Sequence, residues 1–465
     1  MVKLYNTQTR SKEEVQPQSG KTFNIYTCGP TVYDFAHIGN FRTYIFEDLL
    51  RRTLQYFGYK VNQVMNITDV DDKTIRGALS TKKSLADYTK PFTEAFFADL
   101  KTLSIQPAEK YPKATDHFPE MIAMIEMLLQ KKIAYKGQDD SIYFRISQFP
   151  TYGKLSHLKL DELEQGASAR TASDEYEKET AADFVLWKAY DEKRDGNIFW
   201  ESPFGKGRPG WHLECSAMAH KHLGETLDIH CGGVDNIFPH HENEIAQSEC
   251  CFNKPLSRYW LHSEHLLVDN KKMSKSLGNF YTLRNLLDKG YTGREVRYLL
   301  LTSHYRTQLN FTLDGLSAAR NSLKRFDDFI QRLQQAEGSG TIDLTKTEEC
   351  FAAGLSDDLN ISVSLASLFD LVRDVNALID QKKLEKESAE HILVFLQKCN
   401  EVLAVLQFEK EHLEIPHEVS EMLKKRNEAR AAKNWAEADS LRDQISDKGF
   451  MIVDGSNGPE LKVMQ

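Results

Sequence analysis

The sequence lacks any long run of apolar residues. No window approaches the ~18 uninterrupted apolar residues that a membrane-spanning helix needs, and the start, MVKLYNTQTRSKEE, has no apolar core of a secretion signal. Cysteine is also scarce, because seven in 465 residues is an odd number and too sparse for a disulfide framework. We therefore expect a cytoplasmic protein that crosses no membrane. Any cysteine with a functional role would then be a metal ligand or a nucleophile.

The chain also lacks a strong excess of one charge. It has 59 Lys and Arg against 68 Asp and Glu, which gives a net charge of −9. This balance argues against the nonspecific electrostatic binding of nucleic acid that histones show, although a local basic patch can still bind phosphates. The length and the 41% of hydrophobic residues are typical of a soluble globular protein with several domains.

Strand and helix patterns alternate at the start of the chain. Residues 22–28 and 61–68 have strand patterns, and residues 41–59 between them carry apolar side chains at helical spacing. Strand patterns return at 226–233 and 259–268. Because a βαβ unit builds a parallel sheet, we predict an α/β fold with a Rossmann-like, doubly wound parallel sheet.

Helical patterns dominate elsewhere. Residues 85–190 are mostly helical and charged, and they separate the two groups of predicted strands. Beyond residue 312, three apolar stripes predict an antiparallel helical bundle. After Pro416 come a helical stretch, 418–447, and one short strand, 450–455, which together predict a small α+β domain at the end of the chain.

A short motif, His37-Ile38-Gly39-Asn40, follows the first predicted strand. At the start of a helix, backbone amides and the helix dipole favour a phosphate, and the glycine leaves room for a nucleotide. His37 and Asn40 can donate hydrogen bonds to a phosphate oxygen as negative charge builds there. Turn and capping chemistry is the alternative interpretation of such a short motif.

A second motif, KKMSKSLGN, occupies residues 271–279. Lys271, Lys272 and Lys275 make it a cationic loop suited to the charge on a leaving pyrophosphate. A solvated surface turn is the alternative. Both motifs follow predicted strands in different halves of the sheet, where an open parallel sheet binds ligands, and this position favours a binding site.

Together the two motifs, HIGN and KMSKS, resemble the signature pair of the class I aminoacyl-tRNA synthetases, which activate an amino acid with ATP. The resemblance implies that His37, Gly39 and Asn40 hold the phosphates of ATP, which carries Mg²⁺. It also implies that Lys272 and Lys275 stabilise the transition state for attack on the α-phosphate. The family motif ends in His where this chain has Asn40.

Four side chains from distant stretches form a candidate zinc site. Cys28 lies shortly before His37, and Cys215 lies in GWHLECS. His240 and Glu244, in FPHHENE, are four residues apart and so share one face of a helix. Any one of the four is explained as well by a buried core or turn residue, but their joint occurrence favours zinc.

The contexts of these residues resemble the cysteinyl-tRNA synthetase family nearly from end to end. The matching segments are CGPTVYDFAHIGN, NITDVDDK, GWHLECS, FPHHENEIAQS and HYRTQLNF. The resemblance implies L-cysteine and cysteine tRNA as partners, and a monomer. It further implies that Trp211 and Thr68 contact the substrate and that His230 and Asp235 contact the adenosine; core packing explains Trp211 equally well.

A zinc ion would provide the selectivity that an apolar pocket lacks. Such a pocket separates near-isosteres by only about a hundredfold, too little to distinguish cysteine from serine. Zinc prefers sulfur to a hydroxyl and lowers the pKa of a thiol. Because two thiolates and a carboxylate would more than neutralise the ion, we predict that it holds the substrate rather than activating water.

The resemblance also assigns roles to the predicted domains, with the bundle and the tail holding the tRNA and the tail reading the anticodon. Trp435, in the tail, suits either base stacking or helix packing. The predicted domains are the first half of the catalytic domain (1–84), the insertion (85–190), the second half (191–268), the KMSKS loop and stem-contact region (269–312), the bundle (313–410) and the anticodon-binding tail (416–465).

Three other functions are weighed against this one. A cysteine ligase on the same catalytic core would join cysteine to a small amine, but it needs no anticodon reader such as the tail. A zinc hydrolase built on HHENE lacks the second histidine of HExxH and leaves KMSKS unexplained. A protein that only binds RNA would leave the metal ligands and both ATP motifs without a role.

Overall fold

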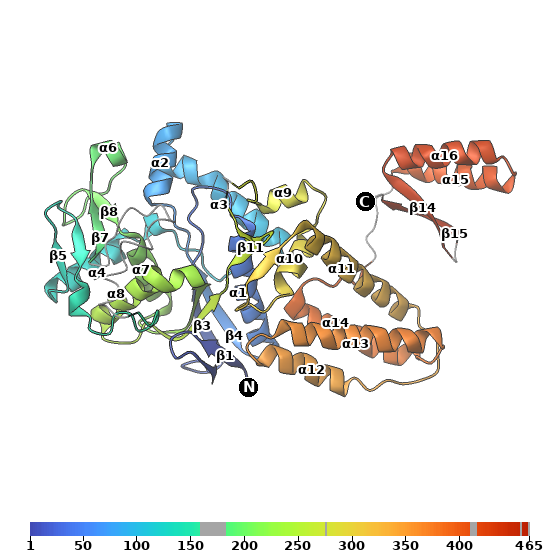
Figure 1. Ribbon diagram of the computed structural model, residues 1–465, viewed down its shortest axis with the longest axis horizontal. Helices are drawn as coiled ribbons and strands as arrows, with labels where there is room; N and C mark the ends of the chain where they lie inside the picture. Colours follow the sequence, from blue (N-terminus) through green and yellow to red (C-terminus); the bar gives the residue numbers. More distant parts are fainter. Residues whose placement is uncertain (159–182, 275–276, 410–415, 456–457, 464–465) are drawn as a thin grey trace. The chain divides into compact units, whose positions relative to one another are not determined.

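The chain divides into two compact units, residues 1–406 and 407–465. The computed structural model describes residues 1–158, 183–274, 277–409, 416–455 and 458–463 (Figure 1). Within these ranges, no helix has the length and apolar character needed to cross a lipid bilayer.

A parallel sheet of four strands forms the centre of the first unit (Figure 1). The strand order is β10-β9-β3-β4, and each neighbouring pair is parallel. This arrangement confirms the predicted Rossmann-like sheet. The four strands are β3 (Thr22–Thr27), β4 (Lys60–Met65), β9 (Leu227–Gly233) and β10 (Ser257–Ser263).

Helices cover both faces of this sheet. On one face, Tyr26 of β3 and Val64 of β4 pack with Leu213 and Ile245 in a single core cluster. The helix α1 connects β3 to β4 and contacts β4, β9 and β10. The helices concerned are α1 (Ile38–Tyr56), α7 (Trp211–Leu223) and α8 (Glu242–Phe252).

The insertion begins with helices and continues with a sheet. We predicted a mostly helical insertion, but an antiparallel sheet of order β5-β6-β7-β8 follows its helices. Three of these strands have only three residues, too few to show the alternation by which a strand is recognised in sequence. The elements are α2 (Asp72–Thr81), α3 (Leu85–Thr102), α4 (Phe118–Gln130), β5 (Ala134–Lys136), β6 (Ile142–Phe144), β7 (Phe184–Ala189), α6 (Glu192–Asp195) and β8 (Gly207–Pro209).

A small sheet follows the central one. The predicted strand 259–268 is in fact the end of β10 and a separate strand, β11, which pairs in parallel with β13 and antiparallel with β12. The elements of this region are β11 (Leu266–Val268), β12 (Lys271–Lys272), α9 (Leu283–Leu287), α10 (Gly293–Leu301) and β13 (Leu309–Phe311). A separate hairpin of β1 (Lys3–Asn6) and β2 (Ser11–Glu14) begins the chain.

The first unit ends in the predicted helical bundle. The apolar stripe of its first helix is buried, as Leu316, Leu323, Phe326 and Ile330 show. The bundle helices are α11 (Leu313–Gln334), α12 (Thr345–Ser356), α13 (Ile361–Asp380) and α14 (Lys386–Leu403).

The second unit packs two helices with a hairpin around Val419, Ile445 and Leu461. We predicted one strand here, but there are two; Gly458 and Pro459 at the start of the second obscure its pattern. Trp435 is 58% exposed, so it does not fill this core. The elements are α15 (His417–Ala431), α16 (Trp435–Asp447), β14 (Phe450–Gly455) and β15 (Gly458–Val463).

Candidate metal and nucleotide site

The HIGN turn caps the helix α1 with its own side chains. The backbone N–H of Asn40 donates to His37 Nδ1 (3.2 Å), and the backbone N–H of His37 donates to Asn40 Oδ1 (3.1 Å). Because Nδ1 accepts, the proton of a neutral His37 ring lies on Nε2, which can donate to a phosphate. Asn40 likewise keeps its amide NH₂ as a donor. The capping and phosphate-binding interpretations of the motif are therefore compatible.

The segment around KMSKS lies against this turn. A Cβ on Gly39 would lie 2.9 Å from His37 Nδ1 and 3.2 Å from Met273 Cε, so the glycine leaves room for both side chains beside the turn. The Ile38 N–H donates to the Tyr281 carbonyl (3.0 Å), and the His37 and Phe280 rings meet edge to face at 5.3 Å. The two motifs, more than 230 residues apart in the chain, are thus neighbours. Lys272 is exposed on β12, whereas Lys275 lies outside the described residues.

The four predicted metal ligands come together. Sulfur, nitrogen and carboxylate atoms of Cys28, Cys215, His240 and Glu244 all lie within 4.8 Å of one another. Cys28 directly follows β3, Cys215 lies on α7, and Glu244 lies in the first turn of α8. All but Cys28 are buried. The set therefore assembles at the carboxyl end of the sheet, and its member Cys28 lies nine residues before His37 of the HIGN turn.

The donor atoms of this cluster fit a cation such as zinc. His240 Nε2 and Glu244 Oε1 are 3.0 Å apart, yet Glu244 Oε1 makes no hydrogen bond to the described residues. The Cys215 sulfur and burial raise the pKa of Cys28 well above its usual value, and burial lowers that of His240. Burial thus favours protonated thiols and a neutral imidazole, and a bound divalent ion would shift the thiols to thiolates.

The side chains of His212 and Trp211 contact the His240 ring and orient it. Its Nδ1 lies 2.9 Å from His212 Nδ1, which leaves Nε2 for the metal cluster. The Trp211 ring stacks on the His240 ring at 4.0 Å, with an interplanar angle of 25°. Trp211 thus packs against one member of the cluster, and its predicted contact with the substrate stays a prediction.

His241 joins the cluster and His212 contacts its member His240, although our sequence analysis selected neither of them. His241 Nε2 lies 3.3 Å from the Cys28 sulfur, and its Nδ1 lies 2.8 Å from His262 Nε2. His230 and His241 form an alternative set of four with Cys28 and Glu244. His212 and His241 each lie within a motif that we had singled out, so their presence there was the available signal.

The weaker sequence predictions stay predictions. His230 is fully buried, stacks on Trp260 and lies 3.0 Å from Glu244 Oε2, so it lies beside the metal cluster. Asp235 is exposed just after β9. Thr68 is buried and donates to Glu214 Oε2 (3.1 Å), beneath the loop that follows Cys28.

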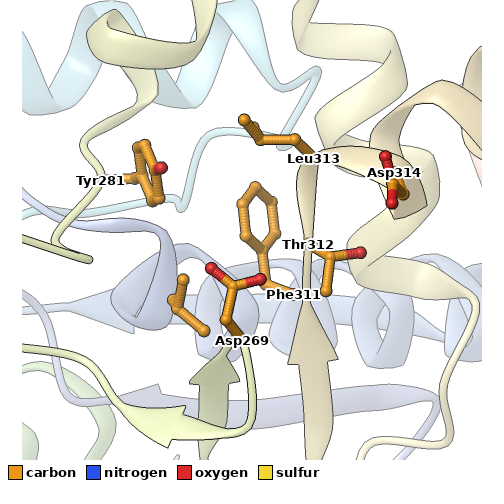
Figure 2. A pocket seen from close by; sticks show the side chains of 7 residues that line it. Asp269, Tyr281, Phe311, Thr312, Leu313 and Asp314 are labelled. Atoms are coloured by element: carbon orange, nitrogen blue, oxygen red, sulfur yellow. The ribbon is translucent and has the colours of Figure 1, made fainter.

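A separate pocket of about 220 Å³ lies beyond the strands β11 and β13 (Figure 2). Figure 2 shows Phe311 at its floor, with Tyr281 and the carboxylates of Asp269 and Asp314 around it. Two carboxylates at the rim would repel the phosphates of a nucleotide. The phosphate site is therefore better placed at the HIGN turn than in this pocket.

Family models match three successive parts of the chain. Residues 14–321 match the catalytic domain described as tRNA synthetases class I (C). Residues 350–407 match the DALR domain, and residues 412–458 match the cysteinyl-tRNA ligase anticodon binding domain. The first match alone covers more than half of the chain.

Similar proteins and structures agree with these models. A cysteine–tRNA ligase of Protochlamydia amoebophila is 59% identical over 99% of this chain and 98% of its own length, and one of Chlamydia felis is 58% identical over 99% and 97%. The fold resembles a methionyl-tRNA synthetase of Mycobacterium tuberculosis in complex with methionyl-adenylate, with a TM-score of 0.61, 15% identity and coverage of 83% and 89% of the two chains. A LeuRS–tRNA–LeuAMS complex of Agrobacterium radiobacter K84 has a TM-score of 0.58, 12% identity and coverage of 84% and 85%. The chain therefore belongs to the cysteine–tRNA ligase family, whose catalytic domain is that of a class I aminoacyl-tRNA synthetase.

Proposed function

We propose that this chain activates L-cysteine with ATP and Mg²⁺ and transfers the cysteinyl group to the 3′ end of cysteine tRNA, with a zinc ion selecting the substrate thiol. The observation that carries the proposal is the convergence of Cys28, Cys215, His240 and Glu244 within 4.8 Å, with Cys28 on the chain segment that leads to the HIGN turn. A bound zinc ion would supply a soft Lewis acid that takes the substrate sulfur as a thiolate in preference to the hydroxyl of serine.

The other side chains of the proposed site orient the metal ligands or bind the phosphates of ATP. His212 holds His240 so that Nε2 faces the other ligands, and Trp211 stacks on that ring beside the pocket. His37 Nε2 and the Asn40 amide donate to ATP phosphate oxygens, where negative charge increases during attack of the carboxylate on the α-phosphate. Lys272, and Lys275 in the same motif, neutralise the departing pyrophosphate.

The domain roles form part of the proposal. Residues 1–84 and 191–268 build the activation site, residues 85–190 are the insertion, and residues 269–312 carry the KMSKS loop and contact the acceptor stem. Residues 313–410 and 416–465 hold the tRNA, and the tail reads the anticodon. The exposed Trp435 side chain in the tail is suited to stacking on a base.

ATP–pyrophosphate exchange dependent on cysteine tests this function. We expect exchange with cysteine and at least about a thousandfold less with serine, more than the hundredfold that an apolar pocket supplies. Exchange that does not depend on cysteine would contradict the proposal. Charging of cysteine tRNA in the same preparation distinguishes a tRNA ligase from a cysteine ligase that joins cysteine to a small amine, because the latter leaves the tRNA uncharged.

An Asn40→Asp substitution is expected to slow pyrophosphate exchange by about 100-fold or more, the usual cost of losing one donor to a developing negative charge. An aspartate can still accept the His37 N–H and so preserve the cap, but it lacks an NH₂ donor and adds negative charge near the phosphates. Steady-state exchange kinetics measure the effect, and thermal unfolding checks the fold. Asn40→His, which restores the family residue, serves as the control and should retain activity.

A further inference from the structure

A short segment of the insertion, residues 152–156, is attached to α8, the helix at the metal cluster. Glu242, the first residue of α8, is fully buried. Its carboxylate accepts hydrogen bonds from the backbone N–H groups of Gly153 (2.8 Å), Leu155 (3.1 Å) and Ser156 (2.9 Å). A carboxylate that accepts from several N–H groups forms strong, charge-assisted hydrogen bonds. We call residues 152–156 the clasp.

Two side chains of the clasp also contact α8. The Tyr152 hydroxyl donates to Asn243 Oδ1, in the first turn of the helix. Lys154 Nζ lies 2.7 and 2.6 Å from the two carboxylate oxygens of Glu249, about two turns further along. The clasp therefore follows α8 from its start, where most of the contacts between the two segments lie.

The start of α8 has no cap of its own. The first N–H groups of a helix have no partner within it, and the side chain of the preceding residue commonly caps them. Here that residue, His241, makes no capping hydrogen bond, and the turn before α8, Ile237–His241, includes an extended backbone at Phe238. The proposed metal ligands His240 and Glu244 lie on either side of this uncapped boundary. Contacts from outside the helix must therefore hold their backbone in place.

The shape of the clasp depends on Gly153. Its φ of +93° lies in the left-handed region that favours glycine, and a Cβ there would lie 2.1 Å from the carbonyl oxygen of Leu158. The tight turn at Gly153 directs its own N–H, and those of Leu155 and Ser156, toward one carboxylate. A substitution at Gly153 therefore disturbs the clasp without changing any side chain of α8.

We propose that Glu242 is a positioning residue for the metal cluster, because it holds the start of α8 against the clasp and so keeps His240 and Glu244 in place for the ion. The inference rests on the proposed function, since it takes the cluster to bind zinc. Glu242 belongs to neither set of candidate metal ligands, and its carboxylate is occupied by the clasp. His212 and Trp211 act on the His240 ring, whereas Glu242 acts on the backbone that carries both ligands. A pair of ligands fixed in this way is preorganised for the ion.

The test disturbs the contact from each side in the full-length protein. Glu242→Gln keeps the size of the side chain but places an NH₂ donor where three N–H groups need acceptors. Gly153→Ala disturbs the clasp and leaves α8 unchanged. Competition with a chromophoric chelator measures zinc affinity, and the visible spectrum of the Co²⁺-loaded protein reports the geometry of the site. We expect both variants to bind zinc about 10-fold or more weakly, as is usual for residues that support metal ligands, and to change the Co²⁺ spectrum.

The kinetics of pyrophosphate exchange provide a second measurement. KM for cysteine should rise by about 10-fold or more in both variants, because the metal that receives the thiol is held less well. KM for ATP should stay within about twofold, since the HIGN turn is fixed by its own hydrogen bonds. A general weakening of the fold would not separate the two substrates in this way.

Two controls match these changes. Gly205→Ala alters another glycine with positive φ (+108°), where an added Cβ would meet no atom within 4 Å, and Glu249→Gln alters α8 beyond its first turn. Both should bind zinc as tightly as the unmodified enzyme. Circular dichroism checks the fold, and if Glu242→Gln does not fold, Gly153→Ala decides alone. Unchanged zinc affinity in folded Gly153→Ala would overturn the inference, whereas an unmodified protein that binds no zinc would overturn the proposed function instead.

Discussion

The His240→Ala enzyme is expected not to retain zinc and to slow in cysteine-dependent pyrophosphate exchange by more than about 100-fold, which exceeds the cost of losing a residue that only orients a metal ligand. In the proposed zinc site His240 would be the neutral nitrogen ligand, since burial lowers its pKa well below the usual value. Without it, two cysteines and a carboxylate remain, and the thiols ionise with difficulty because the Cys28 pKa is raised. Elemental analysis after dialysis measures the metal, and exchange kinetics measure the activity.

The ATP site should survive this change. The HIGN turn is built from backbone amides and from the mutual hydrogen bonds of His37 and Asn40, none of which involves His240. We therefore expect calorimetry to show ATP binding close to that of the unmodified enzyme. Full exchange by the metal-free enzyme, or by His240→Ala without metal, would contradict the role of the cluster.

Two histidines of helix α7 serve as graded controls. His212 contacts His240 and is not itself a member of the proposed metal set, so His212→Ala should weaken metal binding by about 10 to 100-fold rather than abolish it. His220, on the same helix, stacks on Phe252 at 3.9 Å, away from the cluster. His220→Ala should keep both the metal and the exchange activity.

Sequence patterns predicted those helices and strands whose own residues show a clear periodicity of apolar side chains. The βαβ unit and the first bundle helix have enough residues for their periodicity to appear, and both are confirmed. The sheet of the insertion was missed because its strands are short and are stabilised by neighbours distant in sequence. The second strand of the tail hairpin was missed because Gly458 and Pro459 mask its pattern.

The candidate site shows the same limit. Cys28, Cys215, His240 and Glu244 were selected by residue type and spacing, and their atoms meet in the structure. The spacing pointed to His240, but it could not show that His241 forms an alternative set with Cys28, His230 and Glu244, because that depends on which partner each ring nitrogen meets. His212 and His262 supply those partners, and they come from a different helix and a different strand.

An Arg297→Met substitution is expected to destabilise the first unit by about 3 to 5 kcal/mol, the cost of leaving a buried charge without its partner. Arg297, on α10, and Asp48, on α1, form an ion pair at 2.6 Å in which neither side chain is exposed. Burial lowers the pKa of Arg297 from its usual value, while Asp48 opposes that shift. Methionine fills similar space but leaves the Asp48 carboxylate buried with less compensation.

Arg297 also joins parts of the chain that are far apart. Its guanidinium donates to the carbonyls of Leu403, at the end of α14 (2.7 Å), and Leu103, after α3 (3.0 Å). Asp48 in turn accepts from Arg52 (2.7 Å) and from the Gln106 N–H (2.8 Å). The pair therefore ties the helix that begins at the HIGN turn to the bundle and to the insertion, and its loss leaves several buried polar groups unpaired.

Urea unfolding followed by circular dichroism measures the predicted loss, with Arg373→Met as the matched control. Arg373 pairs with Asp370 and Asp374, but it is 67% exposed, so its removal should cost less than about 1 kcal/mol. Asp48→Asn provides the reciprocal change, since it keeps an acceptor for Gln106 but removes the charge that Arg297 needs. Unfolding of Arg297→Met at the same urea concentration as Arg373→Met would contradict the prediction. It would mean that the buried pair Arg297–Asp48 does not stabilise the packing of α1 with the bundle. A large loss in Arg297→Met and Asp48→Asn alone would mean that α1, and with it the HIGN turn, depends on the bundle for its stability.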